Sequence, residues 1–289
     1  MTLSLQRTSA PLGAEIKGVD LALGLDEPTF REVVAAWREY EVIFFRGQTL
    51  TPDEHVALSR RFGELEQHVR QECCRPGYPE IFVVSNVIEN GKPIGSQDAG
   101  LFWHSDLCYK KEPSRGSLFY AREVPQHDGK PRGDTMFSSM TTAYEALPEA
   151  TKRRLAGRLA INSYVRGYYR DRKSGPRREL TAEQMSRTPD VAHPVVRVHP
   201  QTGRKCLFVN EGYTTRILDM EEAESDALLA ELFAHVAKPE FVYRHQWQVG
   251  DFLIWDNCST QHRAVPDYAL PLRRVMERTT LTGCEVLAA

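Results

Sequence analysis

The chain has 289 residues, of which 41% are hydrophobic and 26% charged, and its formal net charge is −2. This composition is ordinary for a globular protein, and without a clustered basic surface it gives no general electrostatic drive toward nucleic acid or membrane. No apolar run approaches the roughly 18 residues that cross a bilayer, and the first residues lack the apolar core and cleavage site of a secretory signal. We therefore expect a cytoplasmic protein that acts on a small molecule, with no nucleic acid and no membrane as a partner.

The cysteines point to a reducing compartment. None of the six forms a CxxC pair, and Cys73 and Cys74 are adjacent, which is poor geometry for a simple bridge. Free thiols fit this spacing best.

Two helices and a buried strand are predicted in the first 62 residues. The first helix covers residues 27–40, and the apolar run at 42–45 suits a buried strand. Thr51 and Glu54 form a capping-box pattern with a proline between them, so a second helix runs from there to about Phe62.

Short strands separated by Gly, Pro and Asp turns continue toward the C-terminus. They are expected at residues 81–85, 117–121, 195–198, 206–209, 241–245, 252–255 and 275–281, with further helices at 141–147, 150–155 and 221–236. This pattern favours a mainly β fold with flanking helices. We expect residues 1–289 to form a single domain around a double-stranded β-helix core, the jelly-roll or cupin-like architecture. The polar stretch 171–190 is either a mobile lid or a surface insertion.

A candidate metal site begins with Trp-His-Ser-Asp at 103–106. In an extended segment, side chains two positions apart project to the same face, so His104 and Asp106 can reach one cation. A His-x-Asp pair arises often by chance, and this pair needs further support.

That support comes from His262, which follows the apolar strand at 252–255 and a Trp-Asp-Asn turn. Two histidines and one carboxylate make the facial triad of non-haem Fe(II) oxygenases, which leaves positions open for a co-substrate and oxygen. Zinc also accepts these ligands, so the triad alone does not identify the metal.

Two arginines further along the chain favour iron. Strand alternation puts Arg274 and Arg278 on one face and Arg273 on the other. Guanidinium groups that point into a barrel need anionic partners. 2-Oxoglutarate supplies one, because its keto acid end chelates iron and its far carboxylate pairs with arginine. The alternative is that these arginines form surface salt bridges, as most arginines do.

The chain resembles the taurine / 2,4-dichlorophenoxyacetate dioxygenase (TauD/TfdA) family of Fe(II)- and 2-oxoglutarate-dependent oxygenases over nearly its whole length. Besides the segments already described, ordered matches lie at residues 44–48, 61–65, 133–135, 143–147, 193–197, 207–212 and 238–241. The resemblance implies that iron is bound by His104, Asp106 and His262. It also implies that Arg274 pairs with the far carboxylate of 2-oxoglutarate and that Thr135 adds a hydrogen bond to it.

The same resemblance assigns His68 and Arg278 to the substrate, with Arg278 on its anionic group. Phe208 matches an aromatic residue that lines the pocket, although ordinary core packing explains a buried phenylalanine equally well. The interval between His262 and Arg274 is one residue longer than in the family, so Arg273 competes with Arg274 as the 2-oxoglutarate anchor.

Two further departures from the family concern the substrate. Gly100 and Phe102 replace polar residues that precede the Trp-His pair, and residues 126–132 expand a loop that is usually short. Both departures argue against taurine itself as the substrate.

Taken with the resemblance, these residues predict a dioxygenase that uses Fe(II), 2-oxoglutarate and O2 to hydroxylate a small anionic organic substrate. The substrate would be a sulfonate, carboxylate, sulfate ester or phosphonate, with succinate and CO2 as co-products. Two other classes stay open: a metal-dependent hydrolase that uses the same triad to activate water, and a non-catalytic sensor of 2-oxoglutarate or an anion. We also expect a homo-oligomer, either a dimer or a tetramer.

Overall fold

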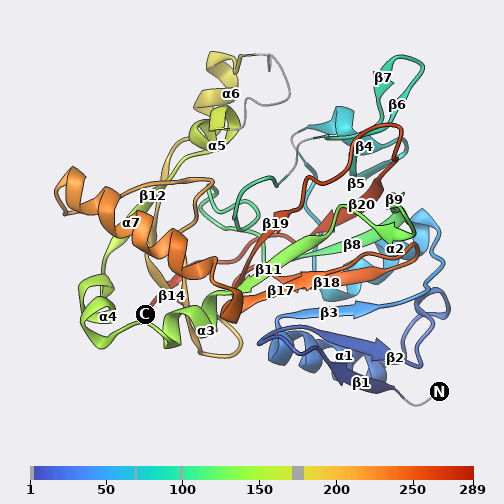
Figure 1. Ribbon diagram of the computed structural model, residues 1–289, viewed down its shortest axis with the longest axis horizontal. Helices are drawn as coiled ribbons and strands as arrows, with labels where there is room; N and C mark the ends of the chain where they lie inside the picture. The colour runs from blue at the N-terminus through green and yellow to red at the C-terminus, as the bar shows by residue number, and fades with distance from the viewer. Residues whose placement is uncertain (1–2, 69, 98–99, 171–178) are drawn as a thin grey trace.

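The computed structural model describes residues 3–68, 70–97, 100–170 and 179–289. The protein is mainly β with several helices, and its largest element is an eight-stranded sheet (Figure 1). In spatial order the strands are β1 (Ser4–Arg7), β2 (Ala14–Lys17), β3 (Val42–Phe45), β18 (Phe252–Asp256), β8 (Gly116–Glu123), β20 (Val275–Thr280), β5 (Tyr78–Ser85) and β4 (Cys74–Arg75). Strands from the two ends of the chain therefore pair in the middle of the sheet.

Smaller sheets complete the β structure. Three of them have three strands each: β17 (Val242–His245), β11 (Thr135–Ser139) and β19 (Thr260–Ala264); β13 (Val191–Pro194), β12 (Leu159–Asn162) and β16 (Thr214–Ile217); and β15 (Lys205–Leu207), β14 (Val196–Val198) and β21 (Leu287–Ala288). Two hairpins are formed by β6 (Ile88–Glu89) with β7 (Lys92–Pro93) and by β9 (Gln126–His127) with β10 (Lys130–Pro131). The second hairpin is the structure of the expanded loop at 126–132.

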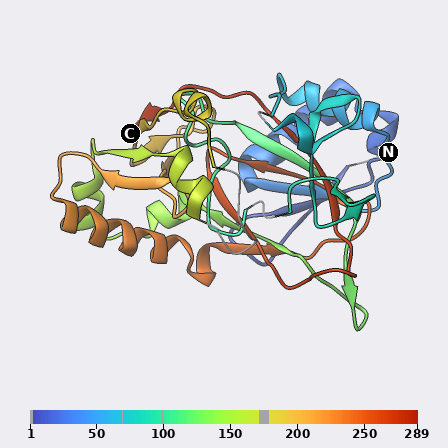
Figure 2. The ribbon, with the colours of Figure 1, turned by 90° about the horizontal axis from the view of Figure 1, so that it is seen from above.

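Helices flank these sheets. They are α1 (Glu27–Tyr40), α2 (Pro52–Phe62), α3 (Met140–Glu145), α4 (Glu149–Leu155), α5 (Tyr164–Arg170), α6 (Ala182–Ser186) and α7 (Glu222–Val236), with short 3-10 turns at Leu21–Leu23, Gln71–Cys73 and Pro239–Phe241. Figure 2 shows α7 along the outside at the end of the molecule opposite α1 and α2. In the described part of the chain, no helix combines the length and the apolar character that a bilayer span requires.

Side-chain caps explain where the first two helices begin. Asp26 accepts a hydrogen bond from the Thr29 backbone at 2.8 Å and caps α1. Thr51 and Glu54 form the expected capping box at the start of α2, since each side chain bonds the backbone of the other residue. The predicted helix boundaries in this part of the chain are confirmed.

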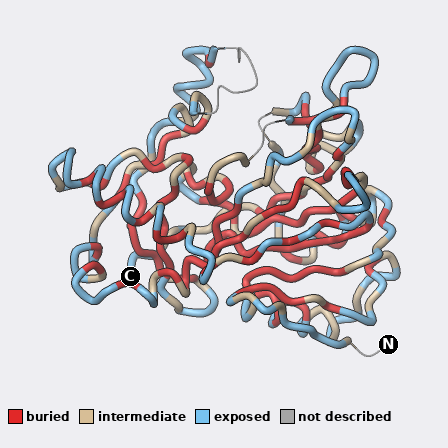
Figure 3. Tube along the Cα trace, in the orientation of Figure 1, coloured by how far each residue is buried: buried red, intermediate tan, exposed pale blue. Residues whose placement is uncertain are grey.

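The central strands of the large sheet are buried on both faces. On one face the sheet packs against α1 and α2, where Trp37 and Phe62 meet edge to face at 5.7 Å. The other face packs against the sheet of β17, β11 and β19, where the ring centre of Phe137 lies 5.7 Å from that of Trp255. Figure 3 shows this double layer as the continuous buried centre of the molecule. The second interface, between the two sheets, is where the candidate site forms.

The structure confirms the remaining predicted helices and strands to within a few residues at their ends, and it adds several strands. Among the elements that the sequence reasoning missed are β1, β2, β11, β12, β13 and β16 and the helix α5. Short strands with mixed polarity give a weak alternation signal. Of the stretch 171–190, residues 171–178 lie outside the described residues. Residues 179–190 contain α6, whose Thr181–Gln184 capping box was also missed.

Candidate active site

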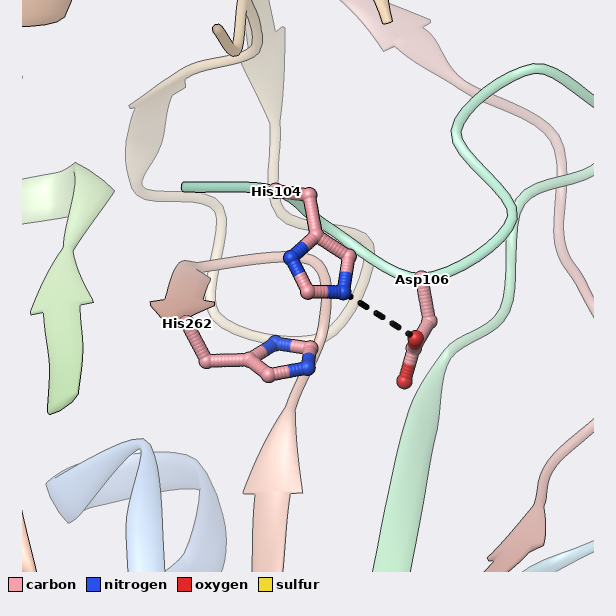
Figure 4. A group of neighbouring side chains, drawn as sticks. All are labelled: His104, Asp106 and His262. Atoms are coloured by element: carbon pink, nitrogen blue, oxygen red, sulfur yellow. Dashed lines mark ion pairs between the residues drawn. The ribbon is translucent and has the colours of Figure 1, made fainter. Parts of the chain in front are cut away.

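The two histidines of the predicted triad face each other across a strand pair. His104 forms an isolated antiparallel bridge with His262 on β19: each backbone N–H donates to the other's carbonyl oxygen, at 3.1 and 2.9 Å. Residues that are paired directly opposite project their side chains to the same side. The two imidazole ring centres are 4.1 Å apart. Figure 4 shows the two rings next to each other, with Asp106 beside them.

Asp106 reaches the same point from the turn that follows. The side chain of Asn257 accepts a hydrogen bond from the Asp106 N–H and donates one to the Asp106 carbonyl, both at 2.7 Å. Asp106 Oδ1 lies 3.8 Å from His104 Nε2, and the candidate ligand atoms of the three residues lie within 4.8 Å of one another. One ion that forms bonds of about 2.0–2.2 Å can reach all three after a small side-chain rotation.

The protonation of the histidines suits a metal ligand. Nδ1 of His104 bonds the Phe102 carbonyl oxygen at 2.9 Å, which places the proton on Nδ1 and leaves Nε2 free to bind a cation. Burial lowers the pKa of His104, and burial together with His104 lowers the pKa of His262 well below its ordinary value. Nδ1 of His262 is buried and has no hydrogen-bond partner among the described residues. Both imidazoles are therefore neutral, as metal binding requires.

Asp106 stays ionised although it is buried. Burial raises its pKa, but the Arg278 guanidinium, with the groups around it, holds the pKa below its usual range. Arg278 Nη1 donates to Asp106 Oδ1 at 2.9 Å, and the Ser117 hydroxyl donates to Oδ2 at 2.8 Å. The donor set of two neutral imidazoles and one carboxylate thus fits Fe(II).

A small cavity extends from the histidines into the space between the two sheets. Its lining includes His104, His262, Thr135, Arg274 and Arg278. The structure thus brings the predicted metal ligands and the predicted 2-oxoglutarate residues to one cavity.

Arg274 is the unusual group in this cavity. It is 3% exposed, and its Nε has no hydrogen-bond partner among the described residues. Its guanidinium is hydrogen-bonded to Tyr268, and burial lowers its pKa. Gly133 leaves room for its stem, because a Cβ there would lie 2.8 Å from Arg274 Cδ. Such a buried cation is costly without an anionic partner.

Arg273 points the other way. Its side chain is 44% exposed and pairs with Glu123 at 2.7 Å and with Glu89 at 3.5 Å. The charge of Arg273 is therefore neutralised at the surface. Its neighbour Arg274 lies on the opposite face, in the cavity, as the predicted strand alternation requires.

Thr135, the other residue assigned to 2-oxoglutarate, is held in place by Trp247. The indole Nε1 donates to the Thr135 hydroxyl oxygen at 3.0 Å. The hydroxyl proton stays available to a ligand, since this contact uses only the oxygen lone pair.

A second cavity, of about 130 Å³, lies on the other side of the triad. It is lined by His68 and Arg278 together with His104 and Asp106. His68 lies against Phe82, with ring centres 4.1 Å apart. Burial, followed by Arg278 and Arg70, lowers the pKa of His68 to about 3. His68 is therefore neutral and can offer a hydrogen bond but no charge.

The sequence reasoning missed the aromatic lining of this second cavity. Tyr109, Tyr164 and Tyr213 line it, with ring centres 4.8 Å apart for Tyr109 and Tyr164 and 5.0 Å apart for Tyr109 and Tyr213. Phe102 adds an edge-to-face contact with Tyr213 at 5.7 Å. Tyr109 follows Asp106 by three positions and was open to prediction from the motif, whereas Tyr164 and Tyr213 reach the cavity only through the fold.

Phe208 lies away from both cavities. It is 3% exposed, its ring centre is 5.5 Å from that of His193, and the guanidinium carbon of Arg197 lies 4.8 Å from it. It is not among the residues that line either cavity beside the triad. The position agrees with the core-packing alternative for this residue.

A second cluster with metal-ligand side chains consists of His199, Asp256 and Cys258. Both ring nitrogens of His199 are already used: Nε2 bonds Asp256 at 2.9 Å, and Nδ1 accepts from the backbone N–H groups of Gln201 and Thr202. This histidine is a structural brace for the turn after β18.

Comparison with known proteins agrees with this geometry. The family profile "Taurine catabolism dioxygenase TauD, TfdA family" matches residues 4–280. An (S)-phenoxypropionate/alpha-ketoglutarate-dioxygenase of Delftia acidovorans is 34% identical over 98% of this chain and 96% of its own. An alpha-ketoglutarate-dependent 2,4-dichlorophenoxyacetate dioxygenase of Cupriavidus pinatubonensis is 34% identical over 92% and 93%.

A solved structure extends the likeness to three dimensions. AAD-2, crystallised with Mn(II) and N-oxalylglycine, is 29% identical, covers 100% of both chains and superposes with a TM-score of 0.82. The fold, the family profile and the full-length relatives agree. This chain belongs to the TauD/TfdA family of dioxygenases.

Proposed function

We propose that this enzyme hydroxylates a small organic anion, with 2-oxoglutarate and O2 as co-substrates and succinate and CO2 as co-products. The single observation that carries the proposal is the cavity that joins His104 and His262 to the buried guanidinium of Arg274, whose Nε has no hydrogen-bond partner among the described residues. A hydrolase has no use for that cation, whereas 2-oxoglutarate has one carboxylate for the metal and one for the arginine.

The chain's own residues have distinct parts in this chemistry. His104, Asp106 and His262 would hold Fe(II), which supplies oxygen activation when bound. Arg274 binds and orients the far carboxylate of 2-oxoglutarate, and the Thr135 hydroxyl donates to it. N-Oxalylglycine, bound in the related AAD-2 structure, has the same two carboxylates and supports this assignment.

The residues that line the second cavity favour a substrate that combines an anionic group with an apolar, aromatic body. Arg278 provides the positive charge, and neutral His68 provides a hydrogen bond. The rings of Tyr109, Tyr213 and Phe102 provide apolar surface, which a sulfonate as small as taurine would leave unused. The relatives named above act on phenoxypropionate and 2,4-dichlorophenoxyacetate. Among the anions considered, an aryloxy carboxylate fits best.

The proposal also includes the architecture of the core and the number of domains. Within the proposal, the large sheet and the sheet of β17, β11 and β19 are the two layers of a jelly-roll core, and residues 1–289 form one dioxygenase domain. Tight packing of Phe137 between these layers supports it. The cytoplasmic location, the dimer or tetramer and the absence of nucleic acid or membrane partners stay predictions.

The test is succinate formation from 2-oxoglutarate with Fe(II), ascorbate and O2 across a panel of aryloxy carboxylates, sulfonates, sulfate esters and phosphonates. We expect the highest rate with an aryloxy carboxylate, inhibition by N-oxalylglycine and no rate in Asp106→Ala. Asp128→Ala, a change at an 84% exposed side chain, is the control and should keep full activity. Hydrolysis of a panel member without O2 would indicate the hydrolase, and 2-oxoglutarate binding without any turnover would indicate the sensor.

A further inference from the structure

A buried arginine lies beside two cysteines, away from the candidate active site. Arg197 on β14 is 0% exposed, and its Nε and Nη1 have no hydrogen-bond partner among the described residues. Its Nη2 lies 3.9 Å from Sγ of Cys284. A buried guanidinium is costly without a counter-charge. The Arg197 guanidinium therefore favours the negatively charged thiolate form of Cys284.

The second cysteine completes a pair. Cys258 lies in the turn between β18 and β19, and Cys284 lies in the C-terminal segment between β20 and β21. Their thiol groups are neighbours, and each changes the pKa of the other. The Cys284 N–H donates to the Pro113 carbonyl at 3.3 Å, and Cys258 Sγ lies 4.0 Å from the Arg115 carbonyl oxygen. Both cysteines are thus fixed to one short segment of the chain.

The two sulfurs differ in access and acidity. Cys258 is 2% exposed, whereas Cys284 is half-buried and reachable from solvent. The neighbouring Cys258 thiol lowers the pKa of Cys284, and Arg197 adds to this effect against the opposing effect of burial. The Cys284 sulfur and burial raise the pKa of Cys258. The contact with Arg197 and the access to solvent make Cys284 the more reactive sulfur, whereas Cys258 is enclosed.

The other cysteines are less accessible or less acidic. Cys73 also has an arginine beside its sulfur, with Arg70 Nη2 at 3.0 Å, but it is only 5% exposed. Burial raises the pKa of Cys73 and Cys74, and it raises the pKa of Cys108 and Cys206 to about 12. Because the thiolate is the reactive form of cysteine, acidity and access together distinguish Cys284 from all five.

We propose that Cys258 and Cys284 form an oxidisable pair, in which Cys284 is the sulfur that reacts with a peroxide and Cys258 is the sulfur that closes the disulfide. First, the Cys284 sulfur attacks one peroxide oxygen, the O–O bond breaks, and the leaving hydroxide takes a proton from solvent to become water. This step oxidises Cys284 to a sulfenic acid.

The second step closes the bridge. The Cys258 sulfur attacks the sulfenic sulfur, the S–O bond breaks, and water leaves with the proton of the Cys258 thiol. Two electrons pass from the two sulfurs to the peroxide, which is the oxidant. Asn257, the neighbour of Cys258, holds both backbone groups of Asp106, so the bridge would form next to a brace of the candidate metal site.

The pair can be tested on the full-length protein with hydrogen peroxide at pH 7, in the presence of a chelator so that no iron-derived oxidant contributes. After the peroxide is removed, free thiols are alkylated and peptides are analysed by mass spectrometry without reduction. We expect a peptide that links Cys258 to Cys284 and disappears on treatment with dithiothreitol. Without peroxide, alkylation of Cys284 should be about tenfold faster than that of Cys74, which is also half-buried.

Single substitutions separate the two roles. Cys258→Ser should accumulate a sulfenic acid at Cys284 that dimedone traps, whereas Cys284→Ser should give no sulfenic acid at Cys258. Cys74→Ser is the control and should form the bridge as the unmodified protein does. Arg197→Met should slow Cys284 alkylation, and Arg197→Lys should restore part of the rate.

The outcome that overturns the proposal is measurable in the unmodified protein alone, so it does not depend on whether the Arg197 variants fold. Equal alkylation rates for Cys284 and Cys74, or peroxide oxidation that leaves Cys258 and Cys284 unlinked, would refute the pair.

Discussion

The guanidinium of Arg278 lies 2.9 Å from the carboxylate of Asp106. The side chains are 12% and 7% exposed, so the pair is largely shielded from water. Asp106 is a candidate metal ligand and Arg278 the candidate anchor of the substrate anion, and one contact therefore joins the two functions. In the structure Asp106 partly neutralises the positive charge of Arg278, which weakens the attraction of Arg278 for a substrate anion. A cation bound by Asp106 would free the Arg278 guanidinium for that anion.

This contact makes Arg278 a residue of both sites. We expect Arg278→Gln to raise the KM for the anionic substrate by about 10- to 100-fold, because a hydrogen bond to a charged group is worth roughly 1.5–3 kcal/mol. It should also strengthen metal binding, since Arg278 no longer competes with the metal for the Asp106 carboxylate. Arg187→Gln is the control, because the Arg187 side chain is 77% exposed and pairs with Glu183 at the surface. Steady-state kinetics and metal titration of both variants measure these effects. An unchanged KM for the substrate in Arg278→Gln would contradict the substrate-binding role of Arg278.

Adjacent arginines offer a matched test of the 2-oxoglutarate anchor. Arg274→Ala should raise the KM for this co-substrate by about 10- to 100-fold, because the charge-assisted bond to its far carboxylate is lost. Arg273→Ala removes only exposed ion pairs with Glu123 and Glu89, which contribute little, and should change the same KM by less than about twofold. Succinate assays at varied co-substrate concentration decide between them, and the reverse ranking would assign the anchor to Arg273.

Gly100 lies against the imidazole of His104. A Cβ at Gly100 would lie 2.9 Å from His104 Cε1, and the residue has φ +78°. We expect Gly100→Ala to displace the ring and to reduce metal affinity at least about tenfold, by analogy with the loss of other groups that orient a metal ligand. Gly129→Ala is matched in backbone strain, with φ +69°, but its Cβ meets no neighbour within 4 Å. Metal titration should separate the two, and equal affinities would show that the His104 ring has room to move.

The protonation of His55 should make the free energy of unfolding depend on pH. His55 is fully buried, and burial lowers its pKa to about 3, below the unfolded value near 6.5. Between these values the unfolded chain binds a proton that the folded chain does not, so the free energy of unfolding falls as the pH drops below about 6.5. From pH 7 to pH 5 the loss from this residue should be about 2 kcal/mol.

Urea unfolding at the two pH values measures this loss. In His55→Gln the difference between pH 7 and pH 5 should shrink by about 2 kcal/mol, whereas His127→Gln, at a 58% exposed side chain, should leave it unchanged. An identical pH dependence in His55→Gln and the unmodified protein would contradict the assignment.

Much of the fold could be predicted from local signals. The capping boxes and apolar runs around Thr51 and residues 42–45 depend on neighbours within a few positions, and α1, β3 and α2 form where these signals place them. The candidate ligands His104, Asp106 and His262 were also readable, because the i, i+2 spacing of the first two and the position of the third after an apolar strand are local patterns. The short strands β11 and β12 were not readable, since their stability comes from partners distant in sequence.

The amino-acid sequence by itself determined which groups are available: two imidazoles, a carboxylate and a strand with arginines on alternate faces. Only the tertiary structure decided that Arg274 is buried while Arg273 is paired at the surface, that Arg278 contacts Asp106, and that Tyr109 and Tyr213 line the second cavity while Phe208 does not. The physical reason is that burial and contact between segments far apart in the chain follow from how the sheets pack, and packing is a property of the whole chain that no local pattern encodes.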